Sequence, residues 1–175
     1  MRKHRPARVE IPKSPVIDTN VLFDFLVWRF SVSFSLPEIA SELRHLRTAD
    51  QRDAVAWYLS WAKPIITSPE VIAELHGRVT RDKKLRQPRL GSFWTFAQQE
   101  LRQLELDEEL MKLLEMQPAT LAHFGPTDTG VLGIAARDRR PVLTEDGKLR
   151  SRCLEEQIKV VSVDEILAFR QDRRG

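Results

Sequence analysis

The stretch Ser14-Pro15-Val16-Ile17-Asp18-Thr19-Asn20-Val21-Leu22 places an acid and an amide inside an otherwise apolar run. Val16 and Ile17 are β-branched and follow a proline, which a strand tolerates at its first residue. The apolar residues that come after Asp18 continue at helical spacing. We therefore expect a short buried strand over residues 15–18, ending at Asp18, and a helix over residues 19–28.

The same alternation of short apolar runs and longer helical patterns continues along the chain. Further strands are predicted at 64–67, 141–144 and 159–161. Further helices are predicted at 36–61 with a break near 47–50, and at 69–79, 93–116, 127–137, 148–156 and 163–170. This order is typical of βαβ units, in which helices cover both faces of a parallel sheet. The predicted fold class is α/β, with a central parallel sheet between two helical layers.

Length and composition favour one soluble domain. The chain has 175 residues, of which 42% are hydrophobic and 30% charged, and no apolar run is long enough to span a bilayer. We expect a basic, flexible leader at 1–13, a single domain at 14–170, a polar tail at 171–175 and a mobile stretch at 81–91. With one cysteine and no secretory signal pattern, a cytoplasmic location is predicted and no membrane partner is expected.

Four acids occupy comparable positions relative to the predicted strands and helices. Asp18 closes the first strand, and Asp146 follows the strand at 141–144, two residues after Thr144. Glu74 lies at the margin of the buried face of the helix at 69–79, and Asp128 shares a helix face with apolar residues. Because ligands collect at the carboxyl ends of parallel strands, we expect these acids to lie close together.

Two of these acids have simpler explanations. Glu74 is four residues before Arg78, so the two side chains can form an ion pair along the helix. Asp128 lies near the start of its helix, where a carboxylate can cap the first backbone amides. The sequence alone leaves these alternatives open.

A cluster of carboxylates repels itself unless a cation neutralises it. Hard oxygen ligands of this kind suit Mg²⁺ or Mn²⁺, and we expect one or two such ions. The chemistry that follows is metal-assisted hydrolysis of a phosphodiester, in which the cation lowers the pKa of the attacking water.

These motifs resemble the PIN-domain nucleases, many of which are VapC-type toxins of toxin–antitoxin modules. The resemblance is carried by VIDTNVL with Asp18 and Asn20, SPEVIAEL with Glu74, TDTGVLGIAA with Asp128, and VLTEDGKL with Thr144 and Asp146. It implies a PIN-like α/β/α sandwich and a Mg²⁺- or Mn²⁺-dependent endoribonuclease that leaves a 5′-phosphate. It further implies that the four acids are catalytic metal ligands supported by Asn20 and Thr144. The implied partners are an RNA substrate, a small antitoxin protein and a second copy of the chain.

Several alternatives accompany this interpretation. The interval from Asp18 to Glu74 is longer than in compact VapC-type toxins. The first alternative is therefore a PIN-domain nuclease that processes RNA without an antitoxin. A catalytically silent scaffold that binds RNA or protein is a second alternative. A third alternative is a phosphatase of the haloacid dehalogenase type, which also places an Asp after its first strand. It requires a second acid two residues later, and Asn20 at that position argues against it.

A group of basic residues follows the third predicted helix. Arg81, Lys83, Lys84 and Arg86 are candidate contacts for RNA phosphates beside the acidic cluster, although a solvated charged loop explains them equally well.

Overall fold

The computed structural model describes residues 10–106 and 118–173 and contains a five-stranded, fully parallel sheet. The strand order is β3-β2-β1-β4-β5. The strands are β1 (Val16–Ile17), β2 (Ile65–Thr67), β3 (Leu104–Leu106), β4 (Val142–Leu143) and β5 (Val160–Val161). The predicted α/β class and four of these strands are therefore confirmed.

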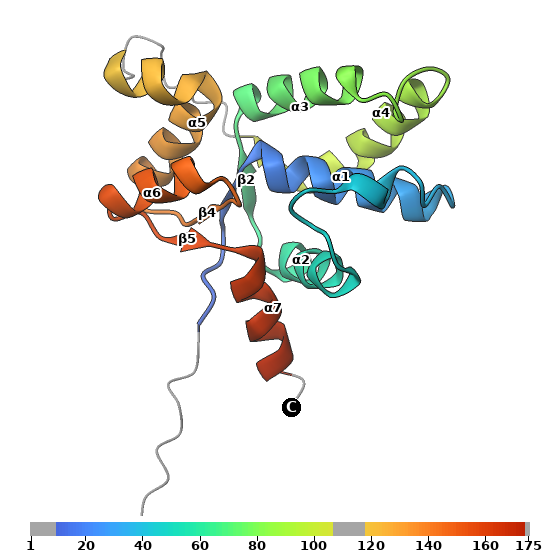
Figure 1. The fold of residues 1–175 in the computed structure, drawn as a ribbon. Helices are drawn as coiled ribbons and strands as arrows, with labels where there is room; N and C mark the ends of the chain where they lie inside the picture. Colours follow the sequence, from blue (N-terminus) through green and yellow to red (C-terminus); the bar gives the residue numbers. More distant parts are fainter. Residues whose placement is uncertain (1–9, 107–117, 174–175) are drawn as a thin grey trace, which may run out of the picture.

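Helices lie on both sides of the sheet (Figure 1). One side carries α1 (Thr19–Ser33), α2 (Ala49–Trp61), α3 (Pro69–Arg81) and α4 (Arg89–Leu101). The other side carries α5 (Pro118–Asp138) and α6 (Gly147–Glu155), while α7 (Val163–Asp172) packs against α2. This arrangement is compatible with the predicted three-layer sandwich. In the described part of the chain, none of the helices is long and apolar enough to cross a membrane.

The predicted helix over 93–116 is wrong beyond Leu101, where α4 ends. The chain instead enters β3, whose Leu104 and Glu105 pair in parallel with Ile65 and Ile66 of β2. Leu101 and Leu104 keep a helical spacing in the sequence, so periodicity alone cannot reveal that the helix has ended. The rest of this prediction, at 107–116, lies outside the described residues.

The predicted helix over 36–61 begins too early. Residues 36–48 contain only a short 3₁₀ helix, η1 (Ala40–Glu42), and α2 starts after Thr48. A capping box marks that start, because the Thr48 hydroxyl accepts from the Gln51 amide and the Gln51 side chain accepts from the Thr48 amide. The intervening segment packs through Ile39 and Leu46, which are both buried.

Two stretches that the sequence predicts to be flexible, at 1–13 and 81–91, contain residues that pack into the fold. Ile11 is buried, and the Tyr58 hydroxyl donates a hydrogen bond of 2.7 Å to the Pro12 carbonyl. The polar stretch at 81–91 is held by Leu85, which is fully buried, and by the Asp82 carboxylate, which accepts from the Lys84 and Leu85 amides. These residues are therefore built into the fold.

The strand order reverses direction between β1 and β4. Connections from β1 to β2 and β3 run one way across the sheet, and the connection from β4 to β5 runs the other way. The crevice outside the carboxyl ends of the strands at such a switch point is where open α/β sheets bind ligands. Asp18 follows β1 and Thr144 follows β4, so both residues lie at this crevice.

Gly125 divides α5 into two helical segments and so determines how Asp128 is presented. Its φ of 78° and ψ of 174° fall in a region that is essentially restricted to glycine. A Cβ atom at this position would meet no atom within 4 Å, so the cost of a side chain is purely conformational. We expect Gly125→Ala to lower the free energy of unfolding by about 1–3 kcal/mol, measured by urea denaturation.

The matched control is Gly91→Ala on the exposed face of α4, where a Cβ atom also meets nothing within 4 Å. Alanine should be neutral there or stabilise the helix by up to about 1 kcal/mol. Equal effects of the two substitutions would contradict a conformational role for Gly125.

Candidate active site

Asp18 is the most buried of the four predicted acids, with 2% of its surface exposed. It occupies the N-cap position of α1, yet its side chain does not cap that helix. Its Oδ2 instead accepts hydrogen bonds from the Thr144 hydroxyl at 2.8 Å and from the Asn20 amide at 3.1 Å. Burial raises the pKa of the Asp18 carboxyl, and these two hydrogen bonds oppose the shift.

Thr144 connects Asp18 to Asp146. The Thr144 side chain is fully buried, and its hydroxyl oxygen also accepts from the Asp146 amide at 3.0 Å. Asp146 is the N-cap of α6, where its Oδ1 accepts from the Lys148 and Leu149 amides at 2.8 and 2.9 Å. The loop after β4 is thereby fixed against β1, and Asp146 has a capping role that the sequence analysis did not predict.

Glu74 forms the ion pair that the sequence analysis left as an alternative. Its Oε1 accepts from Nε and Nη2 of Arg78 at 2.9 and 2.6 Å, and its Oε2 accepts from the Thr19 hydroxyl at 3.2 Å. The Arg78 Nη1 also donates to Asn20 Oδ1 at 2.6 Å. A continuous network therefore links Glu74 on α3 to Asp18 through Arg78 and Asn20.

Asp128 lies three residues beyond the kink at Gly125, on the second segment of α5. Burial, followed by the charges of Asp18, Asp146 and Glu74, raises its pKa to about 7, and the charge of Arg78 opposes this shift. No hydrogen bond to its carboxylate is formed by the residues that the structure describes, so nothing supports the simpler explanation of Asp128 as a helix cap. The four acids thus interact electrostatically although they come from four separate parts of the chain.

The chemistry of these donors fits a divalent cation. All four acids supply hard oxygen ligands, and within the described ranges only Arg78 forms an ion pair with any of them. Among those residues, however, no three His, Cys, Asp or Glu side chains are close enough together to share one ion. One reason is local, because Glu74 Oε1 is directed to Arg78 and Asp146 Oδ1 to the amides of α6.

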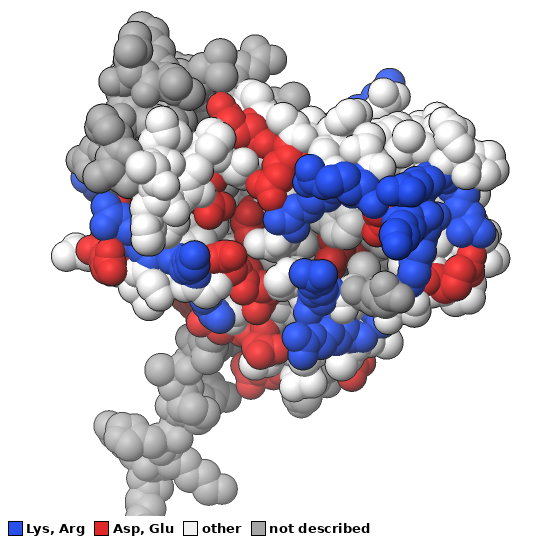
Figure 2. Space-filling view, turned by 45° about the horizontal axis from the view of Figure 1, so that its top comes forward, with Lys and Arg blue, Asp and Glu red and all other residues white. Residues whose placement is uncertain are grey.

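Acidic and basic side chains are separated on the surface of this face of the molecule. Figure 2 shows a band of acidic side chains beside a larger group of basic side chains toward the α3 side. Of the four predicted phosphate contacts, Arg81 and Lys84 line a pocket next to Asn20 and Arg78, whereas Lys83 and Arg86 are exposed elsewhere. Only half of that predicted group therefore converges.

The sequence analysis missed two polar residues around the acids. Thr19 was assigned only to a helix, but it is buried and donates to Glu74. Glu70, in the first turn of α3, was not among the predicted site residues, yet its Oε2 lies 3.3 Å from where a Cβ atom on Gly130 of α5 would be. A glycine at position 130 therefore leaves space for a fifth carboxylate next to α5.

Comparison with known proteins produces no match: no family model, curated protein or solved structure is significantly similar to this chain.

Proposed function

We propose that this chain is a metal-dependent endoribonuclease of the PIN-domain type, with Asp18, Glu74, Asp128 and Asp146 as its catalytic acids. The observation that carries the proposal is the electrostatic coupling of these four acids at the switch point of a parallel sheet. A self-repelling carboxylate cluster destabilises a protein unless it is used to bind a cation. Helix capping accounts for Asp146 and the ion pair with Arg78 accounts for Glu74, but no cap or ion pair among the described residues accounts for Asp18 and Asp128.

The four acids would hold one or two Mg²⁺ or Mn²⁺ ions. The chemistry that such a cation supplies when bound is a more acidic water and a stabilised negative charge on the leaving oxygen. The residues around the acids hold the carboxylates in position. Thr144 and Asn20 direct the Asp18 carboxylate, and the amides of α6 direct Asp146. Arg78 holds Glu74 and contributes the positive charge that a phosphate requires.

The test is cleavage of single-stranded RNA by the purified full chain in Mn²⁺, in Mg²⁺ and in EDTA. We expect cleavage only with a divalent cation and loss of cleavage in Asp18→Asn. The control is Asp53→Asn, which removes an exposed carboxylate from α2 and should cut like the unmodified chain. Cleavage that persists in EDTA or in Asp18→Asn contradicts the proposal. RNA binding in EDTA without cleavage under any condition supports a silent scaffold instead.

Within this class we propose a toxin of a toxin–antitoxin module. Expression of the active chain should arrest growth, Asp18→Asn should not, and a small co-encoded protein should relieve the arrest. Cleavage in vitro without growth arrest would favour an RNA-processing enzyme.

A further inference from the structure

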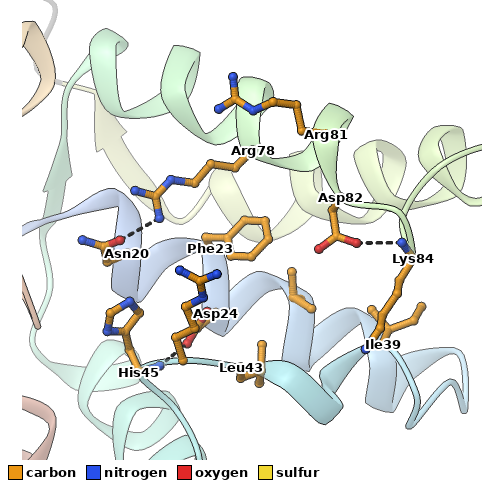
Figure 3. Close-up of a pocket in the computed structure, with 12 residues that line it drawn as sticks. Asn20, Phe23, Asp24, Ile39, Leu43, His45, Arg78, Arg81, Asp82 and Lys84 are labelled. Carbon is orange, nitrogen blue, oxygen red and sulfur yellow. Dashed lines mark hydrogen bonds between the residues drawn. The ribbon is translucent and has the colours of Figure 1, made fainter.

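A pocket of about 430 Å³ opens beside the acidic cluster (Figure 3). Its walls come from α1, from the segment between α1 and α2, and from the end of α3 with the turn that follows. The floor is apolar and is formed by Phe23, Val27, Ile39 and Leu43. Its size is within the range of small-molecule sites, which combine an apolar floor with a few convergent polar groups.

The pocket carries an excess of positive charge. Arg44, Arg78, Arg81 and Lys84 line it together with only two carboxylates, Asp24 and Asp82. Both carboxylates already accept hydrogen bonds from backbone amides. Asp24 Oδ2 accepts from the His45 and Leu46 amides at 2.6 and 3.1 Å, and Asp82 Oδ1 accepts from the Lys84 and Leu85 amides at 2.7 and 3.3 Å.

Two of these cations, Arg44 and Arg81, form no hydrogen bond or salt bridge through their guanidinium groups in the part of the chain that the structure describes. The Arg81 guanidinium lies back along α3 beside Gly77, at the rim of the pocket (Figure 3). Arginine presents a planar set of donors that matches the oxygens of a phosphate. An anion with a phosphate group is therefore the ligand that this rim favours.

The pocket and the acidic cluster share a wall. Asn20 and Arg78 line the pocket, and the same two side chains hydrogen-bond to Asp18 and Glu74 respectively. Figure 3 shows Arg78 reaching across to Asn20 at this boundary. An RNA strand whose phosphodiester lies over the acids would consequently place a neighbouring nucleotide at the pocket.

We propose that this pocket binds one nucleotide of single-stranded RNA next to the scissile phosphodiester. The base lies against the Phe23 ring, and Arg44 and Arg81 bind the phosphate. This inference rests on the proposed ribonuclease function for its biological meaning, but nucleotide binding can be measured without cleavage.

The experiment measures fluorescence anisotropy of a short labelled single-stranded RNA bound to the full chain in EDTA. The RNA is competed with each of the four nucleoside 5′-monophosphates and with inorganic phosphate. We expect the monophosphates to compete better than phosphate. Phe23→Leu should weaken competition by the monophosphates roughly tenfold and leave phosphate unchanged, because it removes stacking. Arg44→Gln and Arg81→Gln should weaken both severalfold.

Two controls match these variants in chemistry. Phe34→Leu removes a half-exposed phenyl ring outside the pocket, and Arg102→Gln removes an exposed guanidinium at the end of α4. Both should behave like the unmodified chain. Because Arg81 is exposed, Arg81→Gln keeps the test valid if Phe23→Leu lowers stability.

Monophosphates that compete no better than phosphate, or pocket variants that bind like the unmodified chain, would overturn the inference. If the chain cleaves RNA but shows either of these two results, the ribonuclease proposal stands and the proposal of a nucleotide-binding pocket is wrong. If the expected binding pattern is found without any cleavage, the pocket binds a nucleotide and the ribonuclease proposal is wrong.

Discussion

Asp128→Asn is expected to lower Mn²⁺-dependent RNA cleavage by roughly a hundredfold or more and, at the same time, to stabilise the metal-free protein at pH 8. The loss of cleavage follows from removing one of four proposed metal ligands. The gain in stability follows from removing a carboxylate that burial and three neighbouring acids make costly to ionise. Opposite effects on activity and stability are typical of residues whose strain serves function.

The pH dependence of this gain has a definite sign. The pKa of Asp128 is raised to about 7 in the folded protein from an ordinary value of 3.8, so the folded state binds the proton more tightly than the unfolded state between these values. The free energy of unfolding of the metal-free chain should therefore fall as the pH rises from about 4 to about 7. Asp128→Asn should flatten this decline and raise the melting temperature at pH 8 by a few degrees.

The measurement is thermal unfolding in EDTA between pH 4 and 8, with Asp53→Asn as the surface control. Addition of Mn²⁺ should raise the melting temperature of the unmodified chain more than that of Asp128→Asn, because a cation stabilises the state that binds it. A stability profile that is unchanged by Asp128→Asn would show that the acids do not repel one another as the structure implies.

Thr144→Val should lower both the stability of the protein and its cleavage activity. Valine retains the shape of the buried side chain but leaves Asp18 Oδ2 without its shorter hydrogen bond and the Asp146 amide without its acceptor. We expect a loss of about 2–4 kcal/mol in the free energy of unfolding, measured by urea denaturation, because one of the lost bonds involves a charged group.

The same substitution tests whether Thr144 is a positioning residue. Its hydrogen bond lowers the pKa of Asp18, so Thr144→Val should raise that pKa further and shift the acid side of the pH–rate profile of cleavage to higher pH. Thr144→Ser restores the hydroxyl and should recover the profile, with only the smaller cost of a lost methyl group. If Thr144→Ser does not restore the pH–rate profile, Thr144 acts through the packing of its methyl group and not through its hydrogen bonds.

Much of the sheet was predictable from local pattern. Val16, Ile17, Val142 and Leu143 are fully buried, and each pair is followed by a polar residue at the carboxyl edge. In a parallel sheet covered on both faces, short apolar runs mark the strands directly. The placement of Asp18 and Thr144 at one edge of the sheet follows from the same rule.

The third strand could not be found in this way. Leu104 and Leu106 alternate around Glu105 over only three residues, immediately after a helix whose leucine spacing they continue. What makes this segment a strand is its pairing with β2, a contact between residues about 40 positions apart. Local propensity cannot report an interaction of that range.

The sequence by itself determined which acids and polar supports follow strands, since that depends on the order of apolar and polar residues. Only the tertiary structure decided how those side chains are used. Hydrogen bonds between separate elements join Thr144 to Asp18, Thr19 to Glu74 and Arg78 to Asn20. The pocket beside Asn20 likewise brings together side chains from positions 20–27, 39–45 and 78–84. The physical reason is that charge coupling and cavities depend on distance in space, which the order of residues along the chain does not specify.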